Sequence, residues 1–293
     1  MVIRAIRFHM EDKTLNIIEN QTFDEERSLY NLKDSEVKGC TFAGPADGES
    51  VLKEARNIVV SDCSFSLRYP LWHVRGFKLI ASTMDEGTRA PIWYASDGSI
   101  EGSTIHGIKC LRECDNMSIH NSKVVSDEFG WRCNNVVIED SEMESVYYLF
   151  ESKNVSVKNL RMKGKYSFQY MENVTIEDSY LDTKDAFWHS KNVTVRNSVV
   201  KGEYLAWFSE GLTLIDCTII GTQPLCYCKD LKLVNCTMED TDLAFEYSDV
   251  EADVKGHIIS VKNPRSGKIV ADSVGEIIFE DAVMETNGQV FIR

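Results

Sequence analysis

A short phrase of the form N-V-x-V-x-[N/D]-[S/C] recurs along the chain at a nearly constant interval, most clearly as NVTIEDS at 173–179 and NVTVRNS at 192–198. Its copies begin at Asn57, Gly76, Asp97, Asn116, Asn135, Asn154, Asn173, Asn192, Gly211, Asp230 and Asp249, after a fainter copy at Asp34. The steps from Asp34 to Asn57 and from Gly76 to Asp97 are longer than the others, which are all equal. Such regularity predicts a solenoid in which each repeat contacts only its neighbours.

Each phrase alternates apolar and polar residues. In 173–179, Val174 and Ile176 are apolar, whereas Thr175 and Glu177 are polar, which is typical of a strand with one buried face. An Asn or Asp such as Asp178 follows, and these residues favour turns. The chain has no long 3.6-residue pattern and no leucine-rich signature. Short strands and turns at this period predict an all-β, single-stranded right-handed parallel β-helix with about 19 residues per coil and roughly 11–13 coils.

The repeat also predicts the domain organisation, because it runs through the chain without a linker. We expect one domain over 1–293, with an N-terminal cap in 1–33, regular coils in 34–255 and irregular last coils in 256–293, where Pro264 and Gly267 interrupt the phase. Caps are expected because an open coil edge would invite pairing with another chain.

Composition limits the partners. The chain carries 32 Lys and Arg against 46 Asp and Glu, a net charge of −14, which would repel nucleic-acid phosphates and anionic lipids. We therefore expect no nucleic-acid and no membrane partner. The first residues, MVIRAIRFHMEDK, lack an apolar run of secretory length, and no stretch is apolar enough to span a bilayer, so a cytoplasmic location is expected.

The nine cysteines have no CxxC pair and no zinc-like spacing. Three pairs share a repeat position on successive coils, namely Cys40 with Cys63, Cys114 with Cys133, and Cys217 with Cys236. We expect reduced thiols stacked in the core, with no metal and no cofactor. The Asn-x-Ser/Thr sequons come from the repeat phrase and do not indicate glycosylation.

One repeat position collects all five tryptophans. Fifteen residues after each phrase start, with the longer early units adjusted, it reads Lys53, Trp72, Trp93, Arg112, Trp131, Phe150, Gln169, Trp188, Trp207, Cys226 and Phe245. The residues immediately before are Leu52, Leu71, Ile92, Leu111, Gly130, Leu149, Phe168, Phe187, Ala206, Leu225 and Ala244, none of them polar. Neighbours on a strand face opposite ways, so we expect the second column inside and the tryptophan column outside.

An exposed aromatic strip edged by charges is typical of a binding surface. Flat rings and neighbouring charges suit a carbohydrate or another small-molecule ligand. The predicted substrate-binding residues are Trp72, Trp93, Lys109, Arg112, Trp131, Arg132, Tyr147, Trp188, Tyr204 and Trp207. The alternative is that the strip is core, or is covered by a terminal segment or a second subunit.

Several phrases resemble an uncharacterised bacterial family of predicted pectate-lyase-like right-handed parallel β-helix proteins. They are GESVLKE at 48–54, RYPLWH at 68–73, RAPIWY at 89–94, TKDAFW at 183–188, GEYLAW at 202–207, LAFEYS at 243–248 and NPRSG at 263–267. The resemblance covers nearly the whole chain and implies the fold. It implies no activity, because the family has no established catalytic residues to carry over. The polygalacturonase-like NTD and RIK phrases are absent.

Two functions remain open. The first is an enzyme of polysaccharide lyase or glycoside hydrolase type, with Asp185, Glu128, Glu203 and His189 as candidate catalytic residues. The basic Lys109, Arg112 and Arg132 would hold a uronate carboxylate in that case. The second is a non-catalytic scaffold that uses the strip to bind a glycan, a protein or a second copy in a homodimer. For any one of these charged residues, a solvated surface charge is the simpler alternative.

Overall fold

The computed structural model describes residues 15–293, so residues 1–14 of the predicted N-terminal cap lie outside the described part. The described chain is an all-β parallel β-solenoid of about 15 turns with about 19 residues per turn, which confirms the predicted fold class. It divides into two compact units, residues 15–146 (unit 1) and 147–293 (unit 2), and each unit is described by itself. In 15–293 no helix is long and apolar enough to cross a membrane.

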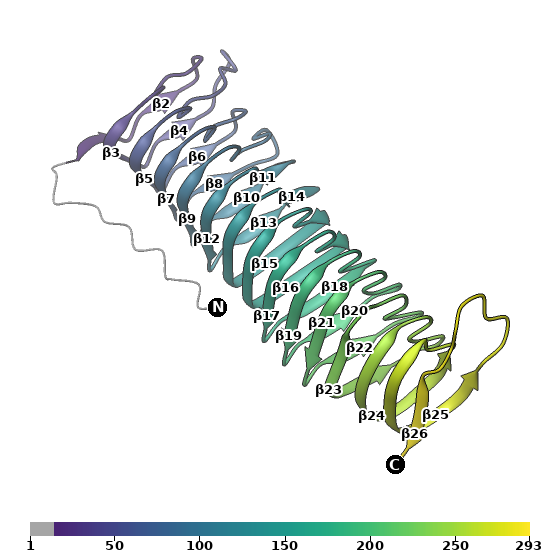
Figure 1. The fold of residues 1–293 in the computed structure, drawn as a ribbon. Helices are drawn as coiled ribbons and strands as arrows, with labels where there is room; N and C mark the ends of the chain where they lie inside the picture. Colours follow the sequence, from purple (N-terminus) through teal and green to yellow (C-terminus); the bar gives the residue numbers. More distant parts are fainter. Residues whose placement is uncertain (1–14) are drawn as a thin grey trace. The chain divides into compact units, whose positions relative to one another are not determined.

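Short parallel strands make up both units, and Figure 1 labels most of them. The strands of unit 1 are β1 (Asn16–Glu19), β2 (Thr22–Phe23), β3 (Lys33–Lys38), β4 (Thr41–Phe42), β5 (Arg56–Ser61), β6 (Ser64–Phe65), β7 (Arg75–Ile80), β8 (Thr83–Met84), β9 (Ser96–Glu101), β10 (Thr104–His106), β11 (Cys110–Arg112), β12 (Asp115–His120), β13 (Lys123–Val125), β14 (Glu128–Trp131) and β15 (Asn134–Tyr148), the last of which runs into unit 2. Those of unit 2 are β16 (Lys153–Ser167), β17 (Glu172–Glu177), β18 (Tyr180–Lys184), β19 (Lys191–Arg196), β20 (Val199–Lys201), β21 (Glu210–Ile215), β22 (Thr218–Ile220), β23 (Leu231–Glu239), β24 (Asp249–Lys262), β25 (Ser266–Ile278) and β26 (Gln289–Ile292).

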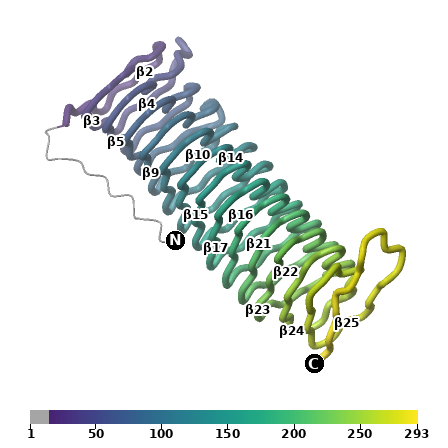
Figure 2. The backbone as a smooth tube through the Cα atoms, viewed as in Figure 1, coloured from purple at the N-terminus to yellow at the C-terminus, as the bar shows by residue number. Residues whose placement is uncertain are grey.

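Strand register reproduces the repeat read from the sequence. Arg56 pairs with Arg75 at the regular step, whereas Lys33 pairs with Arg56 and Arg75 with Ser96 at the two longer ones. Within each unit the backbone makes one turn after another at this interval (Figure 2). Parallel pairing also continues outside 34–255, where β1 pairs with β3 and β25 with β26. The turns therefore outnumber the predicted 11–13, whereas the single domain over 1–293 stays a prediction.

The interior is filled by the predicted apolar columns. Val174 and Ile176 are buried, and so is every residue that precedes the tryptophan column. All nine cysteines are buried and without a disulfide, as predicted for stacked thiols.

A column of Ser and Cys side chains ends most copies of the repeat phrase and links one coil to the next. The Ser103 hydroxyl accepts a hydrogen bond from the Ser82 backbone N–H at 3.1 Å and donates to the Glu101 carbonyl at 3.0 Å. Ser198 does the same with Ser179 and Arg196 in unit 2. The side chain thus satisfies a buried N–H that would otherwise lack a partner, which explains the [S/C] of the phrase.

Asparagines at the phrase start form an outer ladder. The Asn116 side-chain amide donates to Asp97 at 2.9 Å, and that of Asn192 donates to Asn173 at 3.3 Å. All four of these residues have positive φ angles, from 54° at Asn192 to 60° at Asn173, a conformation that Asn and Asp tolerate better than most residues. The sequons therefore follow from backbone geometry, as the sequence indicated.

Candidate functional site

In unit 1 the tryptophan column is a stack of rings with a guanidinium in it, which we call strip 1 (Trp72, Trp93, Arg112 and Trp131). All four side chains are half-buried on the outer wall, so the outward prediction for this column holds here. The Trp72 and Trp93 ring centroids lie 5.2 Å apart with 5° between the planes. The Arg112 guanidinium carbon lies 4.7 Å from the Trp93 centroid and 4.8 Å from that of Trp131, within the range of cation–π attraction.

Unit 2 has the shorter strip 2, formed by Trp188 and Trp207, whose half-buried rings lie 5.5 Å apart with 6° between their planes. Three other members of the predicted outer column are buried in unit 2, namely Gln169, Cys226 and Phe245. The Gln169 amide donates to the Asp185 carbonyl at 2.8 Å, as an indole N–H does elsewhere. The prediction that this column is exposed is therefore wrong for these three residues. Gln169 can be buried because its amide is hydrogen-bonded, and Cys226 and Phe245 because they are apolar.

The indole N–H groups of Trp72, Trp93, Trp188 and Trp207 donate to backbone carbonyls. Trp72 donates to the Ala90 carbonyl and Trp93 to that of Lys109, both at 2.7 Å. Trp188 donates to the Tyr204 carbonyl at 2.6 Å and Trp207 to that of Gln223 at 2.9 Å. Each of these rings is thereby fixed to the backbone of the following coil. What the strips offer a ligand is rigid apolar carbon surface.

A second column of rings lies one residue further along each coil. In unit 2 it comprises Tyr170, His189, Phe208 and Tyr227, with successive centroids 4.8–5.0 Å apart and planes within 18°. We call it the turn column, because all four residues have positive φ angles. Its rings stand nearly perpendicular to those of strip 2, at 81° between Trp207 and Phe208. Phe208 was missed by the sequence reasoning, although it occupies the repeat position of His189 on the next coil.

These separations decide how a ligand can meet the rings. Parallel rings whose centroids are about 5 Å apart are offset rather than directly superposed, so each covers only part of its neighbour. A sugar ring therefore cannot insert between two tryptophans. A ligand would meet the ring edges and the uncovered margins of the faces.

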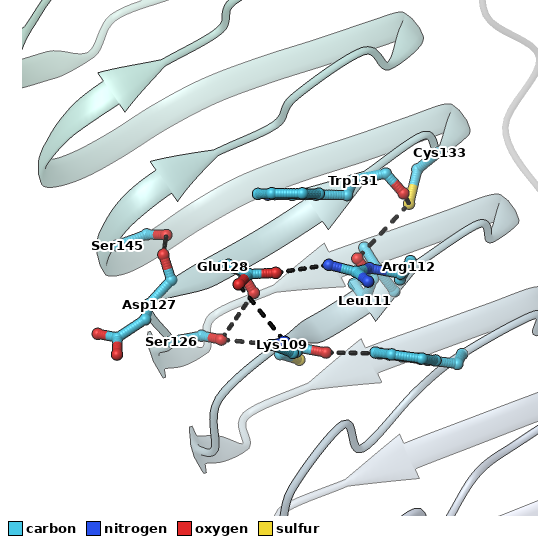
Figure 3. Close-up of polar contacts among 11 residues, drawn as sticks. Lys109, Leu111, Arg112, Ser126, Asp127, Glu128, Trp131, Cys133 and Ser145 are labelled. Carbon is cyan, nitrogen blue, oxygen red and sulfur yellow. Dashed lines mark hydrogen bonds and ion pairs between the residues drawn. The ribbon is translucent and has the colours of Figure 1, made fainter.

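Two of the predicted basic residues of unit 1, Lys109 and Arg112, are paired with one carboxylate (Figure 3). Glu128 lies 2.5 Å from the Arg112 guanidinium and 3.8 Å from the Lys109 ammonium. Both cations thus bind the same carboxylate, and neither is a free site for a ligand carboxylate. Arg132 is exposed on the turn beside Trp131.

In unit 2 the structure brings together three of the predicted residues. Asp185 is only 7% exposed, and its backbone N–H donates to the Glu203 carbonyl of the next coil. The Glu203 carboxylate lies 2.9 Å from the Lys184 ammonium, which in turn lies 5.3 Å from the centre of the Tyr204 ring. Lys184, which the sequence reasoning did not select, forms an ion pair with Glu203, whereas Asp185 is nearly buried.

The remaining predicted residues lie on the same unit but in different settings. His189 is exposed and stacked between Tyr170 and Phe208. Tyr147 is 39% exposed and stacks on Tyr166 at 5.0 Å. Within residues 15–293 no group of three or more His, Cys, Asp or Glu side chains is arranged to hold a metal ion.

Burial raises the pKa of the Asp185 carboxyl; the Lys184 charge opposes this rise and the Glu203 charge adds to it. Because the pKa is higher in the folded than in the unfolded chain, this group favours folding at acid pH and loses that contribution as the pH rises through its folded pKa. Asp185→Asn should thus leave stability nearly unchanged at acid pH and raise it at neutral pH. Chemical denaturation at both pH values measures the effect.

Asp182→Asn is the control for this prediction, because Asp182 is half-exposed and lies 3.4 Å from Lys201. It should not raise stability at neutral pH. An Asp185→Asn variant no more stable than the parent at neutral pH would show that the carboxyl is better solvated than its burial indicates.

Comparison with known proteins adds the family and the fold. The sequence model of a family described as "Protein of unknown function (DUF3737)" matches residues 16–292. No curated protein matches significantly. The surface adhesin PfbA of Streptococcus pneumoniae is 9% identical, with a TM-score of 0.58 over 80% of this chain and 84% of that one.

Two enzymes are similar at a greater distance. The A-module of the Azotobacter vinelandii mannuronan C-5 epimerase AlgE4 is 13% identical, with a TM-score of 0.30 over 93% of this chain and 88% of its own. The catalytic domain of a GH87 α-1,3-glucanase is 9% identical, with a TM-score of 0.33 over 94% of this chain and 63% of its own. The likeness to PfbA, at 9% identity, shows the fold alone.

Proposed function

We propose that this chain, which belongs to the DUF3737 family of proteins of unknown function, binds an extended carbohydrate along the aromatic surface of its outer wall. The observation that carries the proposal is the arrangement of strip 2 beside the turn column. Two perpendicular sets of rings are fixed at coil spacing there, and the indole N–H groups already have backbone partners. A rigid apolar surface of this kind loses little conformational freedom when a ligand binds.

Polar groups beside the rings supply hydrogen bonds for sugar hydroxyls. Asp185, Glu203 and Tyr204 lie on the coils that carry Trp188 and Trp207. A ligand site typically combines apolar surface with a few fixed polar groups in this way. Catalysis is the second candidate, favoured by the nearly buried carboxyl of Asp185 with its raised pKa. In that case Asp185→Asn would abolish turnover and leave binding intact.

Trp188→Ala tests the binding proposal. Loss of a central tryptophan should weaken affinity for an oligosaccharide by about tenfold or more. The measurement is isothermal titration calorimetry with a neutral xylo-oligosaccharide. Tyr180→Ala is the matched control, because Tyr180 is half-exposed in unit 2 and packs against Arg161 instead, and it should bind like the parent.

Two results would contradict the proposal. One is equal affinity for the parent and the Trp188→Ala variant. The other is a fall in mass by light scattering for Trp188→Ala with no sugar binding by the parent, which would assign the strip to a homodimer interface.

A further inference from the structure

One outward column of unit 1 carries three positive charges in succession. Lys33 on β3 pairs in register with Arg56 on β5, and Arg56 pairs with Arg75 on β7. Side chains paired in this way on parallel strands stand about 4.8 Å apart. Like charges at this distance repel one another, and the chain as a whole is acidic. These three residues form the basic column (Lys33, Arg56 and Arg75). It lowers local stability and is opposite in sign to the net charge of the chain.

In unit 2 the same repeat position carries charges of alternating sign, an arrangement that favours stability. There the column runs Lys153, Glu172, Lys191, Glu210 and Lys229, in alternating sign. Lys153 and Glu172 are 2.8 Å apart, and Lys191 and Glu210 are 4.0 Å apart. Hydrogen bonding to Lys153 lowers the pKa of Glu172. Alternation places opposite charges next to each other, and two of these pairs form ion pairs; the basic column of unit 1 departs from this pattern.

The basic column has almost no internal compensation. Arg56 meets one carboxylate, that of Glu54, at 3.9 Å. Among residues 15–293, no carboxylate lies within 4.0 Å of the Lys33 or Arg75 side-chain nitrogens. Lys33 and Arg75 are exposed and Arg56 is half-exposed. All three are open to an anion from solution.

Rings lie close to the column in the chain. Trp72 and His73 come just before Arg75 in the chain, and the Lys53 ammonium lies 5.9 Å from the Trp72 ring centre. His73 stacks on Tyr94 at 4.9 Å. Cations at coil spacing next to apolar ring surface match a polymer that carries both regular negative charge and apolar C–H faces.

We propose that the basic column binds a linear polyuronate, a polysaccharide with one carboxylate on each sugar. The cations stand at strand spacing, about 4.8 Å apart, so more than one carboxylate of the same polymer chain can meet the column. The two arginines bind carboxylates through paired N–H donors, and the lysine acts as a point charge. The site lies within unit 1 and does not rest on the function proposed for strip 2.

Arg56→Glu is the decisive variant, because it converts the column to the alternating Lys-Glu-Arg pattern of unit 2. It should reduce affinity for oligogalacturonate by about tenfold or more while raising the melting temperature by a few degrees. Calorimetric titration and thermal unfolding measure the two effects. Lys191→Glu is the matched control, since it changes net charge equally but in a paired column. It should lower stability and leave the affinity unchanged.

The proposal is overturned if the parent does not bind oligogalacturonate, or if Arg56→Glu and Lys191→Glu weaken binding equally. Tighter binding of single-stranded DNA or heparin than of oligogalacturonate would also overturn it, by assigning the column to phosphates or sulfates. Trp188→Ala distinguishes the two sites. If the Trp188→Ala variant loses neutral-sugar binding, and Arg56→Glu still weakens oligogalacturonate binding in that variant, the column acts independently of strip 2.

Discussion

Replacing Phe187 by alanine is expected to lower the free energy of unfolding by about 3–5 kcal/mol. The side chain is 1% exposed and stacks on Phe168, with ring centroids 5.2 Å apart. Alanine would leave a cavity between coils whose strands hydrogen-bond to each other and cannot close the gap. Equilibrium denaturation followed by circular dichroism measures the loss.

Phe208→Ala is the control, since it removes the same side chain from the outer wall. Phe208 is 45% exposed and contacts the rings of His189 and Tyr227. Its loss should cost about 0.5–1.5 kcal/mol, the range for an aromatic pair. Equal losses for the two variants would mean that inside and outside had been assigned the wrong way round.

The fold could be predicted because the coil is specified many times over. Most copies of the phrase bury two apolar residues, turn at an Asn or Asp, and end on a Ser or Cys, and the Ser hydroxyls bond the preceding coil. Misreading one copy leaves the period unchanged. The register pairs Lys33–Arg56 and Arg75–Ser96 confirm even the two irregular steps.

The ends of the solenoid were less predictable. β1 pairs with β3 at the regular step, Asn16 with Ser35, although 16–19 has no recognisable phrase. Near the other end, β24 pairs with β25 at a shorter step, Asp249 with Ser266. Terminal coils have a neighbour on one side only, so their sequence is less constrained.

The candidate site was predicted as a surface but not as a set of contacts. Alternation places Trp188 outside and Phe187 inside, and the structure confirms both. It could not reveal that the Trp188 N–H donates to the Tyr204 carbonyl, or that Lys184 neutralises Glu203. Those contacts join neighbouring coils and depend on side-chain rotamers, which a repeat pattern does not encode.

For the same reason, the sequence could not show which basic residues are available to a ligand. The sequence selected Lys109 and Arg112 for a ligand carboxylate, yet both pair with Glu128. Arg56 and Arg75 were not selected, because their significance lies in the register that stacks like charges. Pairing between coils decides which surface charge is available to a ligand.

Gly102→Asn is expected to change stability by less than about 1 kcal/mol, although Gly102 has a φ of +57°. An added Cβ would meet nothing within 4 Å. Its counterparts on the preceding and following coils, Ala81 and Asn121, have φ angles of +47° and +48°. A positive φ alone is therefore well tolerated in this solenoid.

Gly202→Ala should behave very differently. Gly202 has a φ of +151°, and an added Cβ would lie 1.6 Å from the Thr183 carbonyl oxygen. We expect about 1–3 kcal/mol of destabilisation from the backbone conformation and about 1–3 kcal/mol from forcing two coils apart, measured by denaturant unfolding. The strain falls on Thr183, directly before Lys184 and Asp185, so the fluorescence of Trp188 and Trp207 should change as well. A variant as stable as Gly102→Asn would mean that the coils at this point are not in close contact.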